Sequence, residues 1–97
     1  RIERRIRSGS VVISRVSVDF RRDFSRLSPA MQEKARQAYQ LFKSNPRHPS
    51  LGFKKLPPHK DLWSVRITGD YRAIGRWRGD VILWFFIGSH ADYDKLL

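Results

Sequence analysis

The sequence predicts an α+β domain in which an N-terminal pair of helices covers one face of an antiparallel sheet of about four strands. Residues 62–90 are the basis of this prediction, because they contain three strand-like runs joined by two short Gly-Asp turns. Before them lie two segments in which apolar residues recur every three or four positions, as in amphipathic helices. Such helices need an apolar surface to pack on, and one face of the sheet provides it.

The expected elements are, in chain order, a strand over 11–18, a helix over 20–27, a helix over about 29–44, a proline-rich loop over 45–61 and the three strands. The first strand is rich in β-branched residues, which favour extended backbone. Asp19 is placed to cap the first helix, and the pair Ser28-Pro29 is typical of a helix start. The tail after the last strand is expected to end in a short helical turn.

The length of 97 residues suits one small domain with one core. We assign residues 11–97 to this domain. Residues 1–10 hold four arginines and a Ser-Gly-Ser break, and we expect them to be a poorly ordered basic arm. The chain has no cysteine, which excludes disulfides and thiolate metal sites and fits a cytoplasmic location. The longest apolar run, residues 81–87, is too short to span a membrane, so no membrane partner is expected.

The charge balance points to an anionic partner. Twenty Lys and Arg residues stand against nine Asp and Glu, which gives a net charge of +11 and a pI of about 11.1. This excess favours association with nucleic acid, an acidic protein or an anionic surface. The three histidines lack metal-ligand spacing, and the sequence has no glycine-rich phosphate loop, so we expect neither a metal nor a cofactor.

The strand register decides which side chains share a face of the sheet. With three residues in each turn, Arg66 lies opposite Arg72 in the first hairpin, and Trp77 lies opposite Val81 in the second. One face is then almost entirely apolar and is expected to pack under the helices; it holds Trp63, Val65, Ile67, Ala73, Val81, Leu83, Phe85 and Ile87. The other face carries the arginines and the remaining large side chains, namely Arg66, Arg72, Ile74, Arg76, Ile82, Trp84, Phe86 and His90.

The arginine-bearing face has the composition of a nucleic-acid site. Two arginines directly opposite each other repel, at a cost of a fraction of a kcal/mol, and a sheet keeps such a pair most readily when an anion lies over it. Positive charge beside aromatic rings is the combination that binds single-stranded nucleic acid. The predicted substrate-binding residues are Arg66, Lys60, Arg76, Trp84 and Phe86. The alternative is a solvated face whose arginines only keep the protein soluble.

Two stretches resemble the RelE/ParE superfamily of bacterial toxins from toxin–antitoxin pairs: DLWSVRITGDYRAI and WFFIGSHADYDKLL. The likeness extends over about residues 11–97 and is most specific in the Tyr-Arg of the central strand and in the closing Gly-x-His-x-x-Tyr-Asp. It implies helices packed on one face of an antiparallel sheet. It also implies one of two activities: RelE-like members enter the ribosomal A site and cut mRNA, whereas ParE-like members poison DNA gyrase.

The resemblance implies catalytic roles for individual residues. Arg72 matches the strand arginine that contacts the scissile phosphate, and Arg66 matches a basic position on the preceding strand. His90 and Tyr93 lie where RelE-like members hold C-terminal acid and base residues. Histidine has an ordinary pKa of about 6.5, which suits proton transfer at neutral pH. We therefore expect His90 to be the general acid, and Tyr93 to orient the base or stack on it.

The chain departs from the YoeB-like pattern, because its two glutamates, Glu3 and Glu33, both lie off the sheet face. The general base stays open between Lys60 and a ribosomal group. The activity we favour is a metal-independent, ribosome-dependent mRNA endoribonuclease. The alternatives are a ParE-like gyrase inhibitor without nuclease activity and a non-catalytic nucleic-acid-binding module. The expected partners are an acidic, partly disordered antitoxin, the ribosome and mRNA.

Overall fold

The structure is a computed structural model that describes residues 13–96, so the predicted basic arm over 1–10 lies outside the described residues. Its elements are β1 (Ile13–Val16), α2 (Val18–Ser25), α3 (Pro29–Ser44), the 3-10 helix η1 (Pro49–Leu51), β2 (Lys54–Lys55), β3 (Leu62–Arg66), β4 (Tyr71–Arg78), β5 (Val81–Ser89) and α4 (His90–Leu96). The predicted α+β class and the helical turn in the tail are confirmed. No helix within the described part of the chain is long and apolar enough to cross a membrane.

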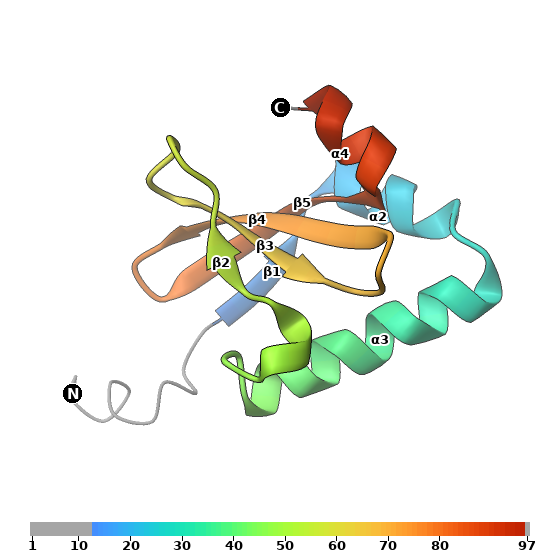
Figure 1. Ribbon diagram of the computed structural model, residues 1–97, viewed down its shortest axis with the longest axis horizontal. Helices are drawn as coiled ribbons and strands as arrows, with labels where there is room; N and C mark the ends of the chain where they lie inside the picture. The colour runs from blue at the N-terminus through green and yellow to red at the C-terminus, as the bar shows by residue number, and fades with distance from the viewer. Residues whose placement is uncertain (1–12, 97) are drawn as a thin grey trace.

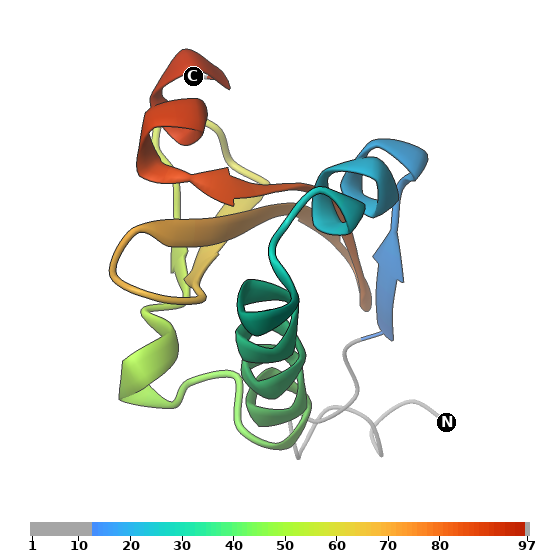
Figure 2. The same cartoon turned by 90° about the vertical axis from the view of Figure 1, so that its right-hand side faces the viewer.

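The five strands form one sheet in the order β1-β5-β4-β3-β2 (Figure 1). The sheet bends around α3, and α4 lies beyond the end of β5 on the other side of the sheet from α3 (Figure 2). Apolar side chains of both α2 and α3 pack on the α3 side of the sheet. The prediction that a helical pair covers one face is therefore confirmed.

Serine side chains set the starts of both helices. Ser17 caps α2, because its Oγ accepts a hydrogen bond from the Phe20 backbone N–H at 3.1 Å. The predicted cap, Asp19, lies instead inside the first turn, so α2 begins earlier than expected. Ser28 caps α3 by accepting from the Met31 N–H, and α3 has the predicted bounds.

The two edges of the sheet differ from the prediction. β1 pairs with β5 in parallel, so the sheet is mixed and not purely antiparallel. Parallel neighbours need a long connection, and here all the chain from α2 to β4 lies between them. At the other edge, part of the predicted loop over 45–61 forms β2, a fifth strand that pairs with β3.

The predicted register holds in the first hairpin and changes in the second. There Arg78 pairs with Val81, so the turn has two residues, and the predicted pairing of Trp77 with Val81 is wrong. Gly79 has a φ of 60°, the left-handed backbone conformation that favours glycine in such a turn. One residue fewer in the turn moves the side chains that follow to the opposite faces of the sheet.

A second register shift occurs in the middle of β5. Ile74 pairs with Phe86 and Gly75 pairs with Trp84, which leaves Phe85 as an extra residue between them. An extra residue on one strand of an antiparallel pair is a β-bulge. Beyond the bulge, β5 returns to the alternation that the sequence predicted.

These two register shifts place the side chains in the first half of β5 on the faces opposite to those predicted. Ile82 and Trp84 face the helices, with exposed fractions of 0% and 5%, whereas Leu83 faces outward and is 39% exposed. The predicted faces of these three residues are therefore wrong. Gly75 makes the arrangement possible, since a Cβ there would lie 2.8 Å from Ile82 Cγ1 and 2.9 Å from Trp84 Cε3. Any side chain at this position would collide with the core.

Two hydrophobic clusters lie on opposite faces of the sheet. The main core consists of Ala35, Phe42, Leu51, Val65, Ala73, Ile82, Trp84 and Ile87. The second cluster consists of Leu56, Leu62 and Ile74, with Phe85 and Phe86 packed against it. The prediction that Phe85 packs under the helices is wrong, because the bulge turns it toward the second cluster. The loop that carries Leu56 thus covers part of the face that the sequence predicted to be open.

The register predicts opposite effects for two neighbouring residues. Ile82→Ala should lower the free energy of unfolding by about 2–5 kcal/mol, because it leaves a cavity in the main core. Leu83→Ala should lower it by less than about 1 kcal/mol, because that side chain is already partly in water. Urea denaturation of the two variants measures both values. A larger loss for Leu83→Ala than for Ile82→Ala would show that the register of β5 is wrong.

Candidate functional site

Two arginines stand opposite each other at one end of the sheet. Arg66 in β3 pairs in register with Arg72 in β4, as predicted. Arg66 is exposed and Arg72 is half-buried. The Arg66 guanidinium lies against Gly52, with Nη2 3.6 Å from the position that a Cβ there would take. Within residues 13–96, no acidic side chain forms an ion pair with either arginine.

The end of β5 and the start of α4 lie beside this pair. Gly88 is the register partner of Arg72, and α4 begins two residues later at His90. The His90 backbone N–H donates to the Asp70 carbonyl oxygen at 2.7 Å, which ties the helix start to the β3–β4 turn. The imidazole Nε2 lies 3.7 Å from Asp94 Oδ2, one helical turn along. The register therefore brings His90 close to the opposed arginines.

A carboxylate that the sequence analysis missed reaches the same place. Asp92 Oδ2 accepts a hydrogen bond from Ser89 Oγ at 3.1 Å, and Ser89 Oγ accepts one from the Asp92 N–H at 3.3 Å. Asp92 Oδ2 also lies 3.3 Å from the position that a Cβ on Gly88 would take. The carboxylate thus stands over the cross-strand neighbour of Arg72. The Ser-x-x-Asp spacing, which is typical of a helix start, is the sequence signal that points to it.

At the opposite end of β4, the carboxylate of Asp61 binds two arginines of the same strand. Arg76 Nη1 and Arg78 Nε both donate to Asp61 Oδ2, at 3.1 Å and 2.9 Å. The hydrogen bond from Arg78, helped by that from Arg76, lowers the pKa of Asp61. The Arg76 guanidinium also lies over the Phe85 ring, 5.9 Å from its centre. Arg76, a predicted substrate-binding residue, is therefore held in an internal ion pair.

Lys60 lies at this second end of the sheet and not beside the opposed arginines. Leu62, two residues after Lys60, pairs with Arg76, which is four residues along β4 from Arg72. At about 3.3 Å per residue, this separation is about 13 Å along the strand. The structure therefore does not bring Lys60 together with Arg72 and His90.

The two predicted stacking residues lie on different faces. Trp84 belongs to the main core, where its ring contacts the Phe42 ring edge-on at 5.4 Å and Nε1 donates to Ser14 Oγ at 3.4 Å. The prediction that Trp84 lies on the arginine face is wrong, because of the register shifts in β5. Phe86 does lie on that face, half-buried against the second cluster.

Tyr93 belongs to α4, and its side chain lies outside what the structure describes. Its proposed role therefore stays a prediction. Within 13–96, no three His, Cys, Asp or Glu side chains are grouped to hold a metal ion. The side chains that gather at the Arg72 end of the sheet supply guanidiniums, which suit phosphate oxygens, together with an imidazole and a carboxylate, which suit proton transfer.

Residues 29–95 match the sequence profile of the ParE-like toxin domain, which spans more than half of the chain. The chain belongs to the family of ParE-like toxins. Membership confirms, at the level of the family, the prediction of a toxin from a toxin–antitoxin pair in the RelE/ParE superfamily. A comparison of this ParE-like toxin with curated protein sequences gives no significant match.

Solved structures share the fold of this ParE-like toxin. One is in the RelB-RelE antitoxin-toxin complex of Methanococcus jannaschii, with a TM-score of 0.70 and 15% identity over 86% of this chain and 98% of that chain. YafQ of E. coli aligns with a TM-score of 0.69 and 15% identity over 84% and 97% of the two chains. The YoeB/ParE toxin of Agrobacterium tumefaciens aligns with a TM-score of 0.65 and 20% identity over 81% and 99%. At these identities the likeness shows a common fold.

The ion pairs of Asp61 predict a loss of stability in acid. Because its folded-state pKa is lowered, ionised Asp61 stabilises the fold above the ordinary pKa of about 4, and this contribution disappears as the pH falls through the folded-state value. Asp61→Asn should therefore lower the melting temperature at neutral pH and flatten its fall in acid. Thermal unfolding between about pH 7 and pH 2 measures this. Asp70→Asn, in an exposed turn, is the control, and an identical pH profile for both variants would contradict the prediction.

Proposed function

We propose that this ParE-like toxin is a ribosome-dependent mRNA endoribonuclease that inhibits translation in the cytoplasm. The observation that carries the proposal is the gathering of Arg66, Arg72, His90 and Asp92 at one end of the sheet. These side chains come from β3, β4 and the start of α4, elements that backbone hydrogen bonds and register hold together. RNA cleavage without a metal requires a cation for the phosphate, a base and an acid, and these groups supply all three.

The two arginines are assigned to the scissile phosphate. A guanidinium presents a planar fork of N–H donors that matches two phosphate oxygens, and two such forks spread the charge of a pentacoordinate transition state. The absence of an ion pair to Arg66 or Arg72 within residues 13–96 supports this role. Arg76 and Arg78, in contrast, are already bound by Asp61.

The proton transfers are assigned to the start of α4. In the proposed reaction, Asp92 accepts the proton of the ribose 2′-OH, and the 2′-oxygen attacks the phosphorus. The bond from phosphorus to the 5′-oxygen breaks, and protonated His90 gives its proton to that leaving oxygen. The products are a 2′,3′-cyclic phosphate and a free 5′-OH, so atoms and charges balance without a co-reactant. Asp92 replaces Lys60 as the candidate base, because Lys60 lies at the other end of β4.

The proposed partners are the ribosome, mRNA and an acidic antitoxin. A net charge of +11 suits both a ribosomal site rich in phosphate and a neutralising acidic protein. Structural neighbours include toxins bound to partners, in the RelB-RelE complex of Methanococcus jannaschii and the DinJ-YafQ complex of E. coli. These complexes support an antitoxin of the same general kind for this chain.

Inhibition of DNA gyrase is the second candidate function. The observation that favours it is the family profile itself, which is that of ParE-like toxins. In this case the arginine face would contact a protein or DNA surface and would need no proton transfer. The two functions therefore differ in whether His90 and Asp92 matter for toxicity.

Arg72→Ala and His90→Gln should each reduce codon-phased cleavage of mRNA on translating ribosomes by about 10²-fold or more, since each removes a transition-state contact or a proton donor. The measurement is a map of mRNA 5′ ends after brief expression of each variant. Arg26→Ala, which removes an exposed arginine next to α2, is the control and should cleave like the parent. Toxicity with intact mRNA and broken chromosomal DNA would instead establish the gyrase function.

Asp92 has both a structural and a proposed chemical role, and two variants separate them. Asp92→Asn keeps an oxygen that accepts from Ser89 Oγ but removes the base, so cleavage should fall about 10²-fold or more with little change in melting temperature. Ser89→Ala removes the hydrogen bonds and keeps the carboxylate, so it should lower the melting temperature more than Asp92→Asn does. Full cleavage activity in Asp92→Asn would exclude Asp92 as the base.

A further inference from the structure

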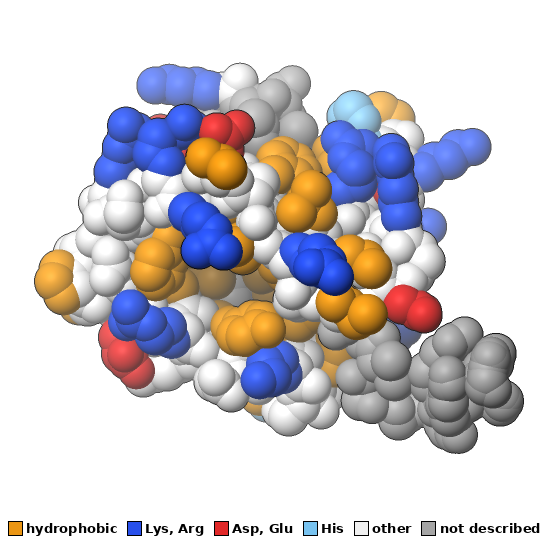
Figure 3. Space-filling view, turned by 180° about the vertical axis from the view of Figure 1, so that it is seen from behind, with side chains coloured by type: hydrophobic (Ala, Val, Ile, Leu, Met, Phe, Trp, Pro, Cys, Tyr) orange, Lys and Arg blue, Asp and Glu red, His pale blue; other side chains and the backbone are white. Residues whose placement is uncertain are grey.

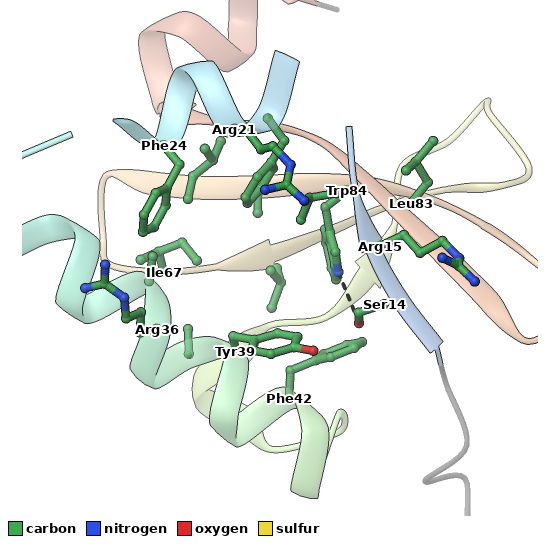
Figure 4. A pocket seen from close by; sticks show the side chains of 17 residues that line it. Ser14, Arg15, Arg21, Phe24, Arg36, Tyr39, Phe42, Ile67, Leu83 and Trp84 are labelled. Atoms are coloured by element: carbon green, nitrogen blue, oxygen red, sulfur yellow. Dashed lines mark hydrogen bonds between the residues drawn. The ribbon is translucent and has the colours of Figure 1, made fainter. Parts of the chain in front are cut away.

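Two hollows flank α3, and they differ in composition. The larger is a groove between α2, α3 and the edge of β1, with a volume of about 790 Å³ (Figure 4). Phe24, Phe42 and Trp84 are among the aromatic side chains that line it. Seen from behind, hydrophobic side chains surround a hollow in the surface, with Lys and Arg side chains at its rim (Figure 3). The groove is separate from the proposed catalytic site, because none of the four residues of that site lines it.

The smaller hollow lies on the other flank of α3 and adjoins the proposed catalytic site. It is enclosed by α3, by η1 and by the end of β3 with the turn that follows, and we call it the α3–η1 pocket. Its volume is about 380 Å³. Sites for small ligands in proteins have volumes of roughly 300–1,000 Å³. The α3–η1 pocket is therefore large enough for one small organic group.

The helix α3 lines this pocket with a stripe of polar and apolar side chains. Lys34, Gln37, Ala38 and Leu41 follow one another at the three- and four-residue spacing that places side chains on one face of a helix. Lys34 and Gln37 are exposed, whereas Ala38 and Leu41 are half-buried and Leu51 of η1 is buried. The pocket thus has an apolar floor and a polar rim. This combination suits a flat aromatic ring that carries polar groups on its edge, such as a nucleobase.

Arg66 joins the α3–η1 pocket to the opposed arginines. Its register partner in β4 is Arg72, and its guanidinium lies against Gly52, beyond the end of β2. The same side chain lines the pocket. Lys34 adds a second cation, and neither Lys34 nor Arg66 forms an ion pair with another residue within 13–96. A phosphate bound to Arg66 therefore lies where its own nucleotide can enter the pocket.

Two hydroxyl groups of the pocket are oriented by their neighbours. Thr68 Oγ1 accepts hydrogen bonds from the Asp70 and Tyr71 N–H groups at 3.2 Å and 3.1 Å, so toward a ligand this hydroxyl acts as a donor. His48 Nδ1 accepts from the Ser50 N–H at 3.1 Å, and Ser50 Oγ lies 2.9 Å from the same nitrogen. Because an accepting Nδ1 carries a lone pair, the Ser50 hydroxyl donates to it and keeps its own oxygen as an acceptor. The pocket therefore presents one donor and one acceptor in fixed positions.

We propose that the α3–η1 pocket holds one nucleotide of the RNA substrate, next to the scissile phosphate. Its base lies on the apolar floor, with the polar edge toward Gln37 and Thr68, and its phosphate pairs with Lys34 and Arg66. Gln37 is the residue that determines specificity, because an amide both donates and accepts and so distinguishes the edges of different bases. The inference rests on the proposed function, because it assigns a specificity site to the substrate proposed there.

Size and charge favour a nucleotide over other anionic groups. A protein helix is about 10–12 Å across with its side chains, which is too wide for a pocket of this volume. A single carboxylate side chain would pair with the cations but would leave the apolar floor uncovered. A nucleotide combines an anionic phosphate with a planar ring. Free nucleotides share this chemistry with RNA, and the position of Arg66 between the pocket and Arg72 favours RNA.

A titration with mononucleotides tests the pocket without assuming any cleavage activity. AMP, CMP, GMP and UMP are each added to the isotope-labelled full chain, and NMR signals are recorded. We expect the signals of Gln37, Ser50 and Thr68 to shift, with the preferred nucleotide bound about fivefold or more tightly than the weakest. Gln37→Leu should remove this preference, because leucine neither donates nor accepts. Gln40→Leu, the same change at an exposed residue of α3 that does not line the pocket, should keep it.

A second titration distinguishes RNA from free nucleotides. The probe is a tetranucleotide with a methyl group on every ribose 2′-oxygen, which removes the proton that cleavage requires. We expect it to shift the signals of Gln37 and Arg72 together and to bind about tenfold or more tightly than the preferred mononucleotide, because two linked contacts reinforce each other. The inference is overturned if no nucleotide shifts the pocket signals, if Gln37→Leu and Gln40→Leu show the same preference, or if the tetranucleotide shifts Arg72 and not Gln37.

Maps of mRNA 5′ ends link the pocket to cleavage. In Gln37→Leu, the nucleotide preference at one position beside the cut should fall about fivefold or more, whereas Gln40→Leu should cut at the same sequences as the parent. An unchanged preference in Gln37→Leu would overturn the inference. Intact mRNA in cells that express the parent would contradict the proposed function instead, and the two titrations would still decide whether the pocket binds a nucleotide of RNA.

Discussion

The β-bulge at Phe85 is the constraint on which the two faces of this protein depend. The two-residue turn before β5 places Ile82 and Trp84 in the core beneath the helices, and the bulge then reverses the alternation of side chains. The following residues return to the other phase, in which Gly88 lies beside Arg72. Gly75 permits the reversal, because any Cβ there would overlap the two side chains that the bulge brings over it. The turn and the bulge together therefore set the two faces of β5, whereas the pairing of Arg66 with Arg72 is set by the β3–β4 hairpin.

The second hydrophobic cluster also determines which arginines on this face are held in ion pairs. Leu56 packs its loop on the arginine face of the sheet. In the same loop, Asp61 forms ion pairs with Arg76 and Arg78. One end of β4 is thereby neutralised, and the other end, with Arg66 and Arg72, has no such partner in the described structure. A face that looks uniformly basic in the sequence is in fact divided into a structural half and a half suited to phosphate.

The distribution of charge differs between the two sides of the sheet. Arg66 and Arg72 are paired in register and have no acidic partner within residues 13–96, which suits a phosphate. The groove between α2, α3 and the edge of β1 presents Arg21 and Arg36 around apolar side chains. The two surfaces lie on opposite sides of the sheet, so that one can be occupied without covering the other.

Local signals in the chain were sufficient for the presence of both helices, the bounds of α3, the first hairpin and the family, because periodicity, turn residues and the Gly-x-His-x-x-Tyr-Asp motif act within a few residues. The sequence analysis did not anticipate the bulge, because the position of the extra residue in β5 depends on how Gly75 packs against Ile82 and Trp84. The parallel pairing of β1, the strand at 54–55 and the ion pairs of Asp61 join residues far apart in the chain, so no local pattern specifies them. For the same reason, only the folded chain separates Lys60 from Arg72 and brings the Asp92 carboxylate over Gly88.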